Sequence, residues 1–187
     1  MNNIAFIGVG VMGKSMVRNL NKAGYHITIF TRTKSKVNDL INEGIDWCNS
    51  IQECVQNKDI IMTMVGYPKD VEDIYYGNHG ILENAKENAI CIDFTTSAPA
   101  LAQKIYTDAK IRNIKSLDAP VSGGDIGAKN GTLSIMVGGD KNVYEDVYPL
   151  FQILGQTINY VGQAGLGQHT KMTNQIVIAG TIAGVVE

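Results

Sequence analysis

The sequence has no excess of either charge. Its 187 residues include 16 Lys and Arg against 18 Asp and Glu, a formal net charge of −2, and like charges are not grouped into blocks. A basic surface of the kind that nucleic-acid-binding proteins present is therefore not expected. The apolar fraction of 44% is enough to bury the core of one domain, or of two if the second is small.

Cysteine is scarce and irregularly spaced. Cys48, Cys54 and Cys91 form no C-x-x-C pair, and no histidine neighbours the first two. An odd number of cysteines with this spacing argues against a disulfide framework and against a zinc site. We therefore expect reduced thiols, as is usual inside cells, and no bound metal.

Long uninterrupted hydrophobic runs are also lacking. The apolar N-terminal stretch is broken by Gly8, Gly10 and Gly13 and follows no positively charged segment, so it does not resemble a targeting peptide. Ile176–Val186 contains only apolar and small residues apart from Thr181, but it is shorter than the roughly 18 residues that a membrane span requires. The sequence predicts a cytoplasmic protein without a membrane segment.

Short apolar runs alternate with amphipathic stretches along most of the chain. The predicted strands are Ile4–Ile7, Ile27–Phe30, Asp59–Val65, Ala89–Ile92, Lys115–Ala119, Leu133–Val137 and Thr157–Val161. The predicted helices between them are Met12–Ala23, Lys34–Asn42, Ile51–Gln56, Pro68–Tyr75, Pro99–Ala109 and Val143–Leu154. Because strands and helices that alternate in this way form right-handed crossovers, we predict a Rossmann-type α/β fold: a doubly wound, mostly parallel sheet with helices on both faces.

Two later segments depart from this alternation. Val121–Gly131 is rich in glycine and is predicted to be irregular, whereas Leu166–Glu187 is predicted to form one long helix. The second half of that helix is apolar on every side and therefore needs a protein partner. We predict a dinucleotide-binding domain over residues 1–164 and, over residues 165–187, the start of a helix leading into an all-α second domain outside this chain. Such an exposed helix also favours a homo-oligomer.

A glycine pattern follows the first predicted strand and opens the first predicted helix. In G-x-G-x-x-G, the first glycine permits a tight turn, the second lets the backbone approach a pyrophosphate, and the third allows close packing of helix on strand. The helix N-terminus adds free N–H donors. A tight turn without a ligand is the alternative, but the position between strand and helix favours dinucleotide binding. The predicted contact residues are Gly8, Val9, Gly10, Val11, Met12 and Gly13.

No carboxylate stands at the end of the second predicted strand, where an acidic residue would bind the ribose 2′-hydroxyl of NAD. The residues there are Thr31, Arg32 and Thr33, with Lys36 shortly after. A guanidinium can make a two-pronged, charge-assisted contact with a 2′-phosphate. These residues predict that NADP is preferred to NAD, unless Arg32 is only a solvated surface residue.

Four segments together resemble the β-hydroxyacid dehydrogenase family. They are Phe6–Gly13, Asp118–Gly124, Gly131–Asp140 and Gly165–Gln175, and they occur in the family's order over essentially the whole chain. The family includes 3-hydroxyisobutyrate dehydrogenase, tartronate semialdehyde reductase and glyoxylate/succinic semialdehyde reductase, and is related more distantly to 6-phosphogluconate dehydrogenase. The resemblance implies an NAD(P)-dependent oxidoreductase that interconverts a small β-hydroxyacid and its semialdehyde or ketone by hydride transfer.

The resemblance also implies roles for particular residues. The family's substrate-binding loop falls on Ser122, Gly123 and Gly124, and its catalytic lysine, the general acid or base, falls on Lys171. The family's amide partner of this lysine falls on Asn174, and Gln175 stands where many members carry a second Asn. The resemblance implies that both amides contact the substrate. Helical spacing agrees with this assignment, because residues three or four apart share one face of a helix.

Further cofactor contacts are implied at the ends of two predicted strands. Met64 and Val65 match a segment that passes along the nicotinamide ribose, although the Gly-Tyr-Pro that follows departs from the family's usual Leu-Pro. Thr95 and Thr96 match a Ser-Thr pair that contacts the nicotinamide. Hydroxyls at the carboxyl end of a strand lie where such sheets bind ligands.

Two other functions remain open. The chain could be a dinucleotide-sensing or protein-interaction module that uses the fold without turnover. The end of the chain partway along its final helix favours this interpretation slightly, whereas Lys171 and the glycine loop oppose it. An imine reductase is the third possibility, and Lys171 argues against it, because the imine-reducing relatives lack that lysine. We favour the hydroxyacid oxidoreductase, with a small hydroxyacid or semialdehyde as its partner.

Overall fold

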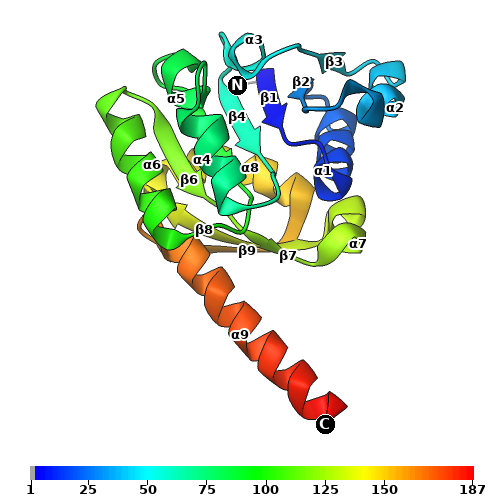
Figure 1. The fold of residues 1–187 in the computed structure, drawn as a ribbon, viewed down its shortest axis with the longest axis vertical. Helices are drawn as coiled ribbons and strands as arrows, with labels where there is room; N and C mark the ends of the chain where they lie inside the picture. The colour runs from blue at the N-terminus through cyan, green and yellow to red at the C-terminus, as the bar shows by residue number, and fades with distance from the viewer. Residues whose placement is uncertain (1–2) are drawn as a thin grey trace.

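The computed structural model describes residues 3–187, which form a nine-stranded sheet with helices on both faces (Figure 1). The strand order is β3-β2-β1-β4-β5-β6-β8-β7, and β9 pairs with β8. The strands are β1 (Asn3–Ile7), β2 (His26–Phe30), β3 (Asp46–Trp47), β4 (Ile60–Thr63), β5 (Ile90–Asp93), β6 (Lys115–Asp118), β7 (Val121–Ser122), β8 (Leu133–Gly139) and β9 (Gly155–Gly162).

The first six strands are all parallel and carry the Rossmann order. Every residue of β4 and β5 is buried, as expected for parallel strands covered on both faces. Beyond β6 the pairing changes, since β8 runs antiparallel to β6 and β7 and parallel to β9. The predicted Rossmann-type, mostly parallel α/β fold is confirmed.

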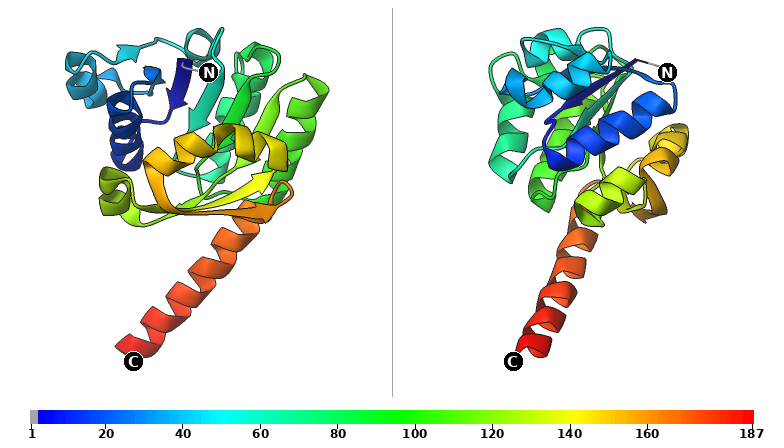
Figure 2. Two further views of the ribbon diagram at one scale, coloured as in Figure 1. Left: turned by 180° about the vertical axis from the view of Figure 1, so that it is seen from behind. Right: turned by 90° about the vertical axis from the view of Figure 1, so that its right-hand side faces the viewer.

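The helices divide into two layers with separate apolar cores. The helical segments are α1 (Val11–Lys22), the 3₁₀ helix η1 (Lys34–Val37), α2 (Asn38–Asn42), α3 (Ile51–Val55), α4 (Pro68–Tyr76), α5 (Ile81–Asn84), α6 (Pro99–Ile111), α7 (Gly124–Asn130), α8 (Lys141–Leu154) and α9 (Leu166–Val186). One core gathers side chains of α1, α2, α7 and α8, and the other those of α3 to α6. Figures 1 and 2 show the two layers from opposite sides, with α4 and α6 before the sheet in Figure 1 and α8 before it from behind.

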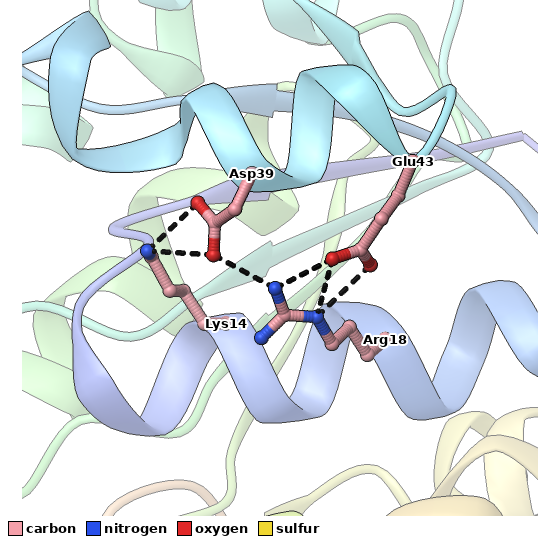
Figure 3. Close-up of polar contacts among 4 residues, drawn as sticks. All are labelled: Lys14, Arg18, Asp39 and Glu43. Atoms are coloured by element: carbon pink, nitrogen blue, oxygen red, sulfur yellow. Dashed lines mark hydrogen bonds and ion pairs between the residues drawn. The ribbon is translucent and has the colours of Figure 1, made fainter.

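Four charged side chains join α1 to α2 (Figure 3). Lys14 Nζ lies 2.9 Å from a carboxylate oxygen of Asp39, and one guanidinium nitrogen of Arg18 lies 2.7 Å from Asp39 and 2.6 Å from Glu43. The Lys14 ammonium lowers the pKa of Asp39 to about 2. These ion pairs fix the helix that follows the glycine turn against the segment that follows β2.

Several predicted boundaries were wrong. Lys34–Asn42 is not one α-helix, because Lys34–Val37 forms the 3₁₀ helix η1 and its last residue, Val37 (φ −124°), departs from α-helical geometry just before α2 begins. The segment 121–131, predicted to be irregular, contains β7 and α7. Its glycines disfavour a helix, but α7 packs on α1, where Asn19 Nδ2 donates to the carbonyl of Ala128 at 2.8 Å. Tertiary contacts therefore outweigh local propensity. The two-residue β3 and the four-residue α5 are too short to produce a periodic pattern.

The predicted long final helix is confirmed as α9, which projects away from the sheet (Figures 1 and 2). Only Gly167, Gln168 and Lys171 of this helix are buried, and its last three turns are exposed. Within residues 3–187, no helix combines the length and apolar character needed to cross a membrane.

Candidate active site

Three glycines shape the turn between β1 and α1, and their surroundings differ. Gly8 has φ +91°, and a Cβ on it would collide with the carbonyl oxygen of Met64. A Cβ on Gly13 would collide with the carbonyl oxygen of Gly8. Gly10 has no atom within 4 Å of the corresponding position. Two glycines are thus required by packing, whereas the third faces open space.

That open space is part of a cleft of about 590 Å³ at the carboxyl ends of β1, β2 and β4. It is lined by Ile7, Gly8, Val9, Gly10, Val11, Met12, Gly13, Phe30, Thr31, Arg32, Thr33, Lys36, Ile51, Met64, Val65, Gly66, Asp70, Asp73 and Ile74. All predicted cofactor contacts except Thr95 and Thr96 are in this set. The cleft opens between β1 and β4, where the strand order reverses and where open α/β sheets bind ligands.

The residues of this cleft fit a dinucleotide. Among the residues described here, no side chain caps the N-terminus of α1 at Gly10, so the first N–H groups of the helix remain free to bind an anion. The absence of a side chain on Gly10 leaves the backbone open to a pyrophosphate. Arg32 and Lys36 provide positive charge at the β2 end of the cleft. When bound, a nicotinamide dinucleotide would supply a site that gives or takes hydride.

Among residues 3–187, Arg32 makes one ion pair at the cleft. Its side chain is 85% exposed, and one guanidinium nitrogen lies 3.4 Å from a carboxylate oxygen of Asp70 at the start of α4. Both residues line the cleft. The positive charge that the sequence predicts for a 2′-phosphate is therefore present, but it faces a carboxylate.

A second polar cluster forms where α9 passes β7. Lys171 Nζ donates to Ser122 Oγ and to Gln175 Oε1, each at 2.8 Å. Asn174 Nδ2 donates to the same Ser122 Oγ at 3.0 Å. Because that oxygen accepts both bonds, the serine proton stays free for another acceptor. The structure thus brings together four of the residues predicted for substrate binding and catalysis.

The surroundings of Lys171 suit a lysine that exchanges a proton. Its side chain is buried, and this burial lowers the pKa of the ammonium below its ordinary value. Beside Ser122, Gly123 (φ +127°) and Gly124 (φ +62°) turn the chain from β7 into α7. The predicted glycine loop and the lysine therefore lie together, joined by the bond from Lys171 to Ser122.

Asp118 and Gln168 hold α9 in place. The carboxylate of Asp118, at the end of β6, accepts the backbone N–H groups of Gly165 at 2.8 Å and of Gln168 at 2.9 Å. The buried Gln168 amide donates to the carbonyl of Thr95 at 2.7 Å and accepts the N–H of Ser97 at 2.8 Å. Gln168 and Lys171 are three residues apart, so these contacts fix the helix face that carries the lysine.

Thr95 connects this helix to the cleft. Its Oγ1 accepts the N–H of Val65, a cleft residue, at 3.0 Å, and its own N–H donates to Asp93 at 3.1 Å. Asp93 also accepts the hydroxyl of Thr63 at 2.7 Å, and burial raises its pKa to about 6. Thr95 is buried and Thr96 is exposed, so only the second of the predicted pair presents its side chain to solvent.

The comparison with protein families identifies this domain. Residues 3–162 match the family described as the NAD binding domain of 6-phosphogluconate dehydrogenase. The chain belongs to this family. The match ends with β9, so α9 and Lys171 lie beyond it.

Relatives of this NAD-binding domain protein are oxidoreductases by name. An uncharacterized oxidoreductase of Bacillus subtilis is 53% identical over 98% of the chain and 64% of its own length. An NAD-dependent L-serine dehydrogenase of Pseudomonas aeruginosa is 38% identical over 100% of the chain and 63% of its own length. The solved structure of Mycobacterium tuberculosis 3-hydroxyisobutyrate dehydrogenase with L-serine has a TM-score of 0.90 at 32% identity, covering 96% of the chain and 60% of that protein. The chain thus spans less than two thirds of these relatives.

Four residues that organise this NAD-binding domain were assigned no role from sequence patterns: Asp70, Asp93, Asp118 and Gln168. Asp93 carried a usable signal, since it is a carboxylate that ends an otherwise apolar strand. Asp118 also ends a strand, but Lys115 and Ser116 make that strand less distinctive. Gln168 lies within the segment Gly165–Gln175 that carries the family resemblance, but no role was predicted for it. Its contacts with the loop after β5 join segments about 70 residues apart in sequence, which no local pattern encodes.

Proposed function

We propose that this chain is the cofactor-binding part of an NAD(P)-dependent oxidoreductase that interconverts a small β-hydroxyacid and its semialdehyde or ketone. The observation that carries the proposal is the buried Lys171 ammonium, hydrogen-bonded to Ser122 beside two glycines. The chain of contacts through Thr95 and Gln168 links this cluster to the dinucleotide cleft. The relatives named as L-serine and 3-hydroxyisobutyrate dehydrogenases support the same substrate class.

Lys171 would move the proton of the reaction. In oxidation, neutral Lys171 would accept the proton of the alcohol hydroxyl as the carbon–hydrogen bond breaks, and a bound nicotinamide would supply the acceptor for the hydride. In reduction, the ammonium returns that proton to the carbonyl oxygen. A pKa lowered by burial supports the base role, because it increases the neutral fraction of the lysine at a given pH.

Ser122, Gly123 and Gly124 would bind the acid. A hydroxyl with a free proton and a glycine loop that exposes backbone N–H groups are suited to a carboxylate. Asn174 and Gln175 hold the hydroxyl and the ammonium in place through the bonds described above. L-serine and 3-hydroxyisobutyrate share the required pattern, a carboxylate with a hydroxyl on the β-carbon.

We further propose that NADP is preferred, through Arg32 and Lys36 at the β2 end of the cleft. The test is a titration of the chain with NADPH and separately with NADH, followed by nicotinamide fluorescence. We expect tighter NADPH binding, reduced by Arg32→Ala. Equal or tighter NADH binding would refute the preference, and no binding of either cofactor at millimolar concentration would refute the cofactor role.

Catalysis is tested by following NADPH or NADH formation with L-serine and 3-hydroxyisobutyrate as substrates. Where the gene encodes a longer polypeptide, that polypeptide is assayed. We expect Lys171→Ala to reduce kcat at least about a hundredfold, as loss of a general acid or base does, while cofactor affinity stays unchanged. Normal turnover in that variant would exclude the proposed role of the lysine.

A dinucleotide-sensing or protein-interaction module is the second candidate. The observation that favours it is the exposed apolar surface of α9, where Ile176, Val177 and Val185 are more than half exposed. Cofactor binding without turnover of any hydroxyacid by the complete polypeptide would favour this second function.

A further inference from the structure

The cleft is lined by two cationic and two anionic side chains. Arg32 and Lys36 line it from the segment after β2, but Asp70 and Asp73 line it from α4. A site that favours a 2′-phosphate by charge alone would carry an excess of cations. The two carboxylates therefore need a role of their own.

Asp70 is held by a backbone hydrogen bond, whereas the Arg32 side chain is largely exposed to solvent. One carboxylate oxygen of Asp70 accepts the backbone N–H of Tyr67 at 3.1 Å, which closes the first turn of α4. The Asp70 side chain is 21% exposed, against 85% for Arg32. Its other oxygen lies 3.4 Å from the guanidinium. The backbone bond thus fixes Asp70, and the ion pair with Asp70 positions the Arg32 guanidinium.

We propose that Asp70 is a specificity-determining residue that limits the preference for a 2′-phosphate. This inference rests on the proposed cofactor function and concerns the same cleft. A phosphate that binds Arg32 must compete with Asp70 for the guanidinium and tolerate a carboxylate beside it. An unphosphorylated ribose meets neither cost, and its hydroxyls can donate to a carboxylate, the role usually played by an acid at the end of β2.

The chain itself provides the variants for a test. Asp70→Asn removes the charge but keeps an oxygen that can accept the Tyr67 N–H, so α4 keeps its cap. Glu72→Gln is the matched control, because it removes one negative charge from the same helix at a residue outside the cleft. Dissociation constants of NADPH and NADH are measured for the wild type and both variants, and thermal unfolding checks that each variant is folded.

We expect Asp70→Asn to tighten NADPH binding about three- to fivefold, the size of one exposed ion pair, and to leave NADH binding equal or weaker. Glu72→Gln should change both dissociation constants less than about twofold, since the lost charge is solvent-exposed and lies outside the cleft. In an Arg32→Ala background, the gain in NADPH affinity from Asp70→Asn should fall below about twofold. The reason is that no guanidinium remains for which Asp70 and the 2′-phosphate could compete.

Three outcomes overturn the inference. They are unchanged NADPH affinity in a folded Asp70→Asn variant, an equal gain in Glu72→Gln, and a gain that persists without Arg32. If the wild type binds a cofactor in any of these cases, the proposed function still stands. If it binds neither cofactor, the proposed function and this inference both fail.

Discussion

At the scale of single residues, the three glycines of the β1–α1 turn have separable roles. Gly8 and Gly13 are required by packing, because a Cβ on either would collide with a backbone carbonyl oxygen. Gly10 has an ordinary φ of −82° and open space around it, so its freedom from a side chain is not a requirement of the fold. Packing therefore does not explain why glycine stands at position 10, whereas the close approach of a pyrophosphate would.

We predict that Gly10→Ala leaves thermal stability nearly unchanged but weakens NADPH binding at least about tenfold, because the methyl group occupies the space above the turn. Gly13→Ala, the matched comparison, should lower the free energy of unfolding by about 1–3 kcal/mol through overpacking. Thermal unfolding and fluorescence titration measure the two effects. Normal NADPH affinity in Gly10→Ala would show that no phosphate approaches this glycine.

Asp93 gives a prediction about pH. Its pKa is raised from 3.8 to about 6, chiefly by burial and in part by nearby Asp118. The folded state therefore binds this proton more tightly than the unfolded state, so the wild type loses stability as pH rises from about 4 to about 6. Asn at this position keeps an oxygen that can accept the Thr63 and Thr95 bonds and has no charge to bury.

We predict that the stability of Asp93→Asn relative to the wild type increases as pH rises from 4 to 7.5. The increase in the difference between their free energies of unfolding should be on the order of 2–3 kcal/mol. Urea unfolding at the two pH values measures the difference. Asp108→Asn serves as the control, because Lys104 lowers the pKa of Asp108 instead of raising it. The stability of that variant relative to the wild type should therefore change with pH in the opposite direction. A pH-independent effect of Asp93→Asn would mean that Asp93 titrates normally.

At the scale of elements, α9 is an anchored helix whose anchor lies at one end. Asp118 binds its N-terminal N–H groups, and Gln168 joins it to the loop after β5. The turns beyond Gln175 are exposed. The position of Lys171 therefore depends on contacts made within the first two turns of the helix.

We predict that Gln168→Leu costs about 1–3 kcal/mol of stability, because the buried carbonyl of Thr95 and the N–H of Ser97 lose their partner. Amide hydrogen exchange over residues 166–172 should become faster. His169→Ala, at the exposed neighbouring position, should change stability by less than about 0.5 kcal/mol. Unchanged exchange in the Gln168 variant would show that Asp118 alone secures the helix.

At the scale of the whole molecule, the exposed apolar part of α9 contrasts with the closed core of the sheet. The exposed apolar residues of this helix are Leu166, Met172, Ile176, Val177, Ile178, Ile182, Val185 and Val186. Surfaces of this kind bind protein. We propose that they bind a second copy of the chain, and that the all-α domain predicted from the sequence would cover them where it is present.

We predict concentration-dependent self-association of the chain, measured by sedimentation velocity, and its reduction by Ile182→Lys. The control is Ile111→Lys, which adds the same charge at an apolar residue that is 77% exposed on α6, far along the chain from α9. Equal effects of the two variants would attribute the change to net charge. A monomer at every concentration would exclude association through α9.

The sequence by itself determined the α/β class, the dinucleotide turn and the long final helix. Each of these depends on a local pattern: buried strands are short apolar runs, the turn requires glycines at fixed spacing, and a long helix repeats its periodicity over many turns. The common face of Lys171 and Asn174 was predictable for the same reason, since both lie on one helix.

Only the tertiary structure decided where that face points and what holds it. The bond from Lys171 to Ser122 joins residues 49 apart, and that from Gln168 to Thr95 joins residues 73 apart. The helix α7 forms despite its glycines because α1 and β8 pack against it. The opposition of Asp70 to Arg32 likewise arises from the adjacency of β1, β2 and β4, which sets the loops after β2 and β4 on either side of one cleft. Contacts between distant segments follow from how the sheet orders its strands, and local sequence does not carry that order.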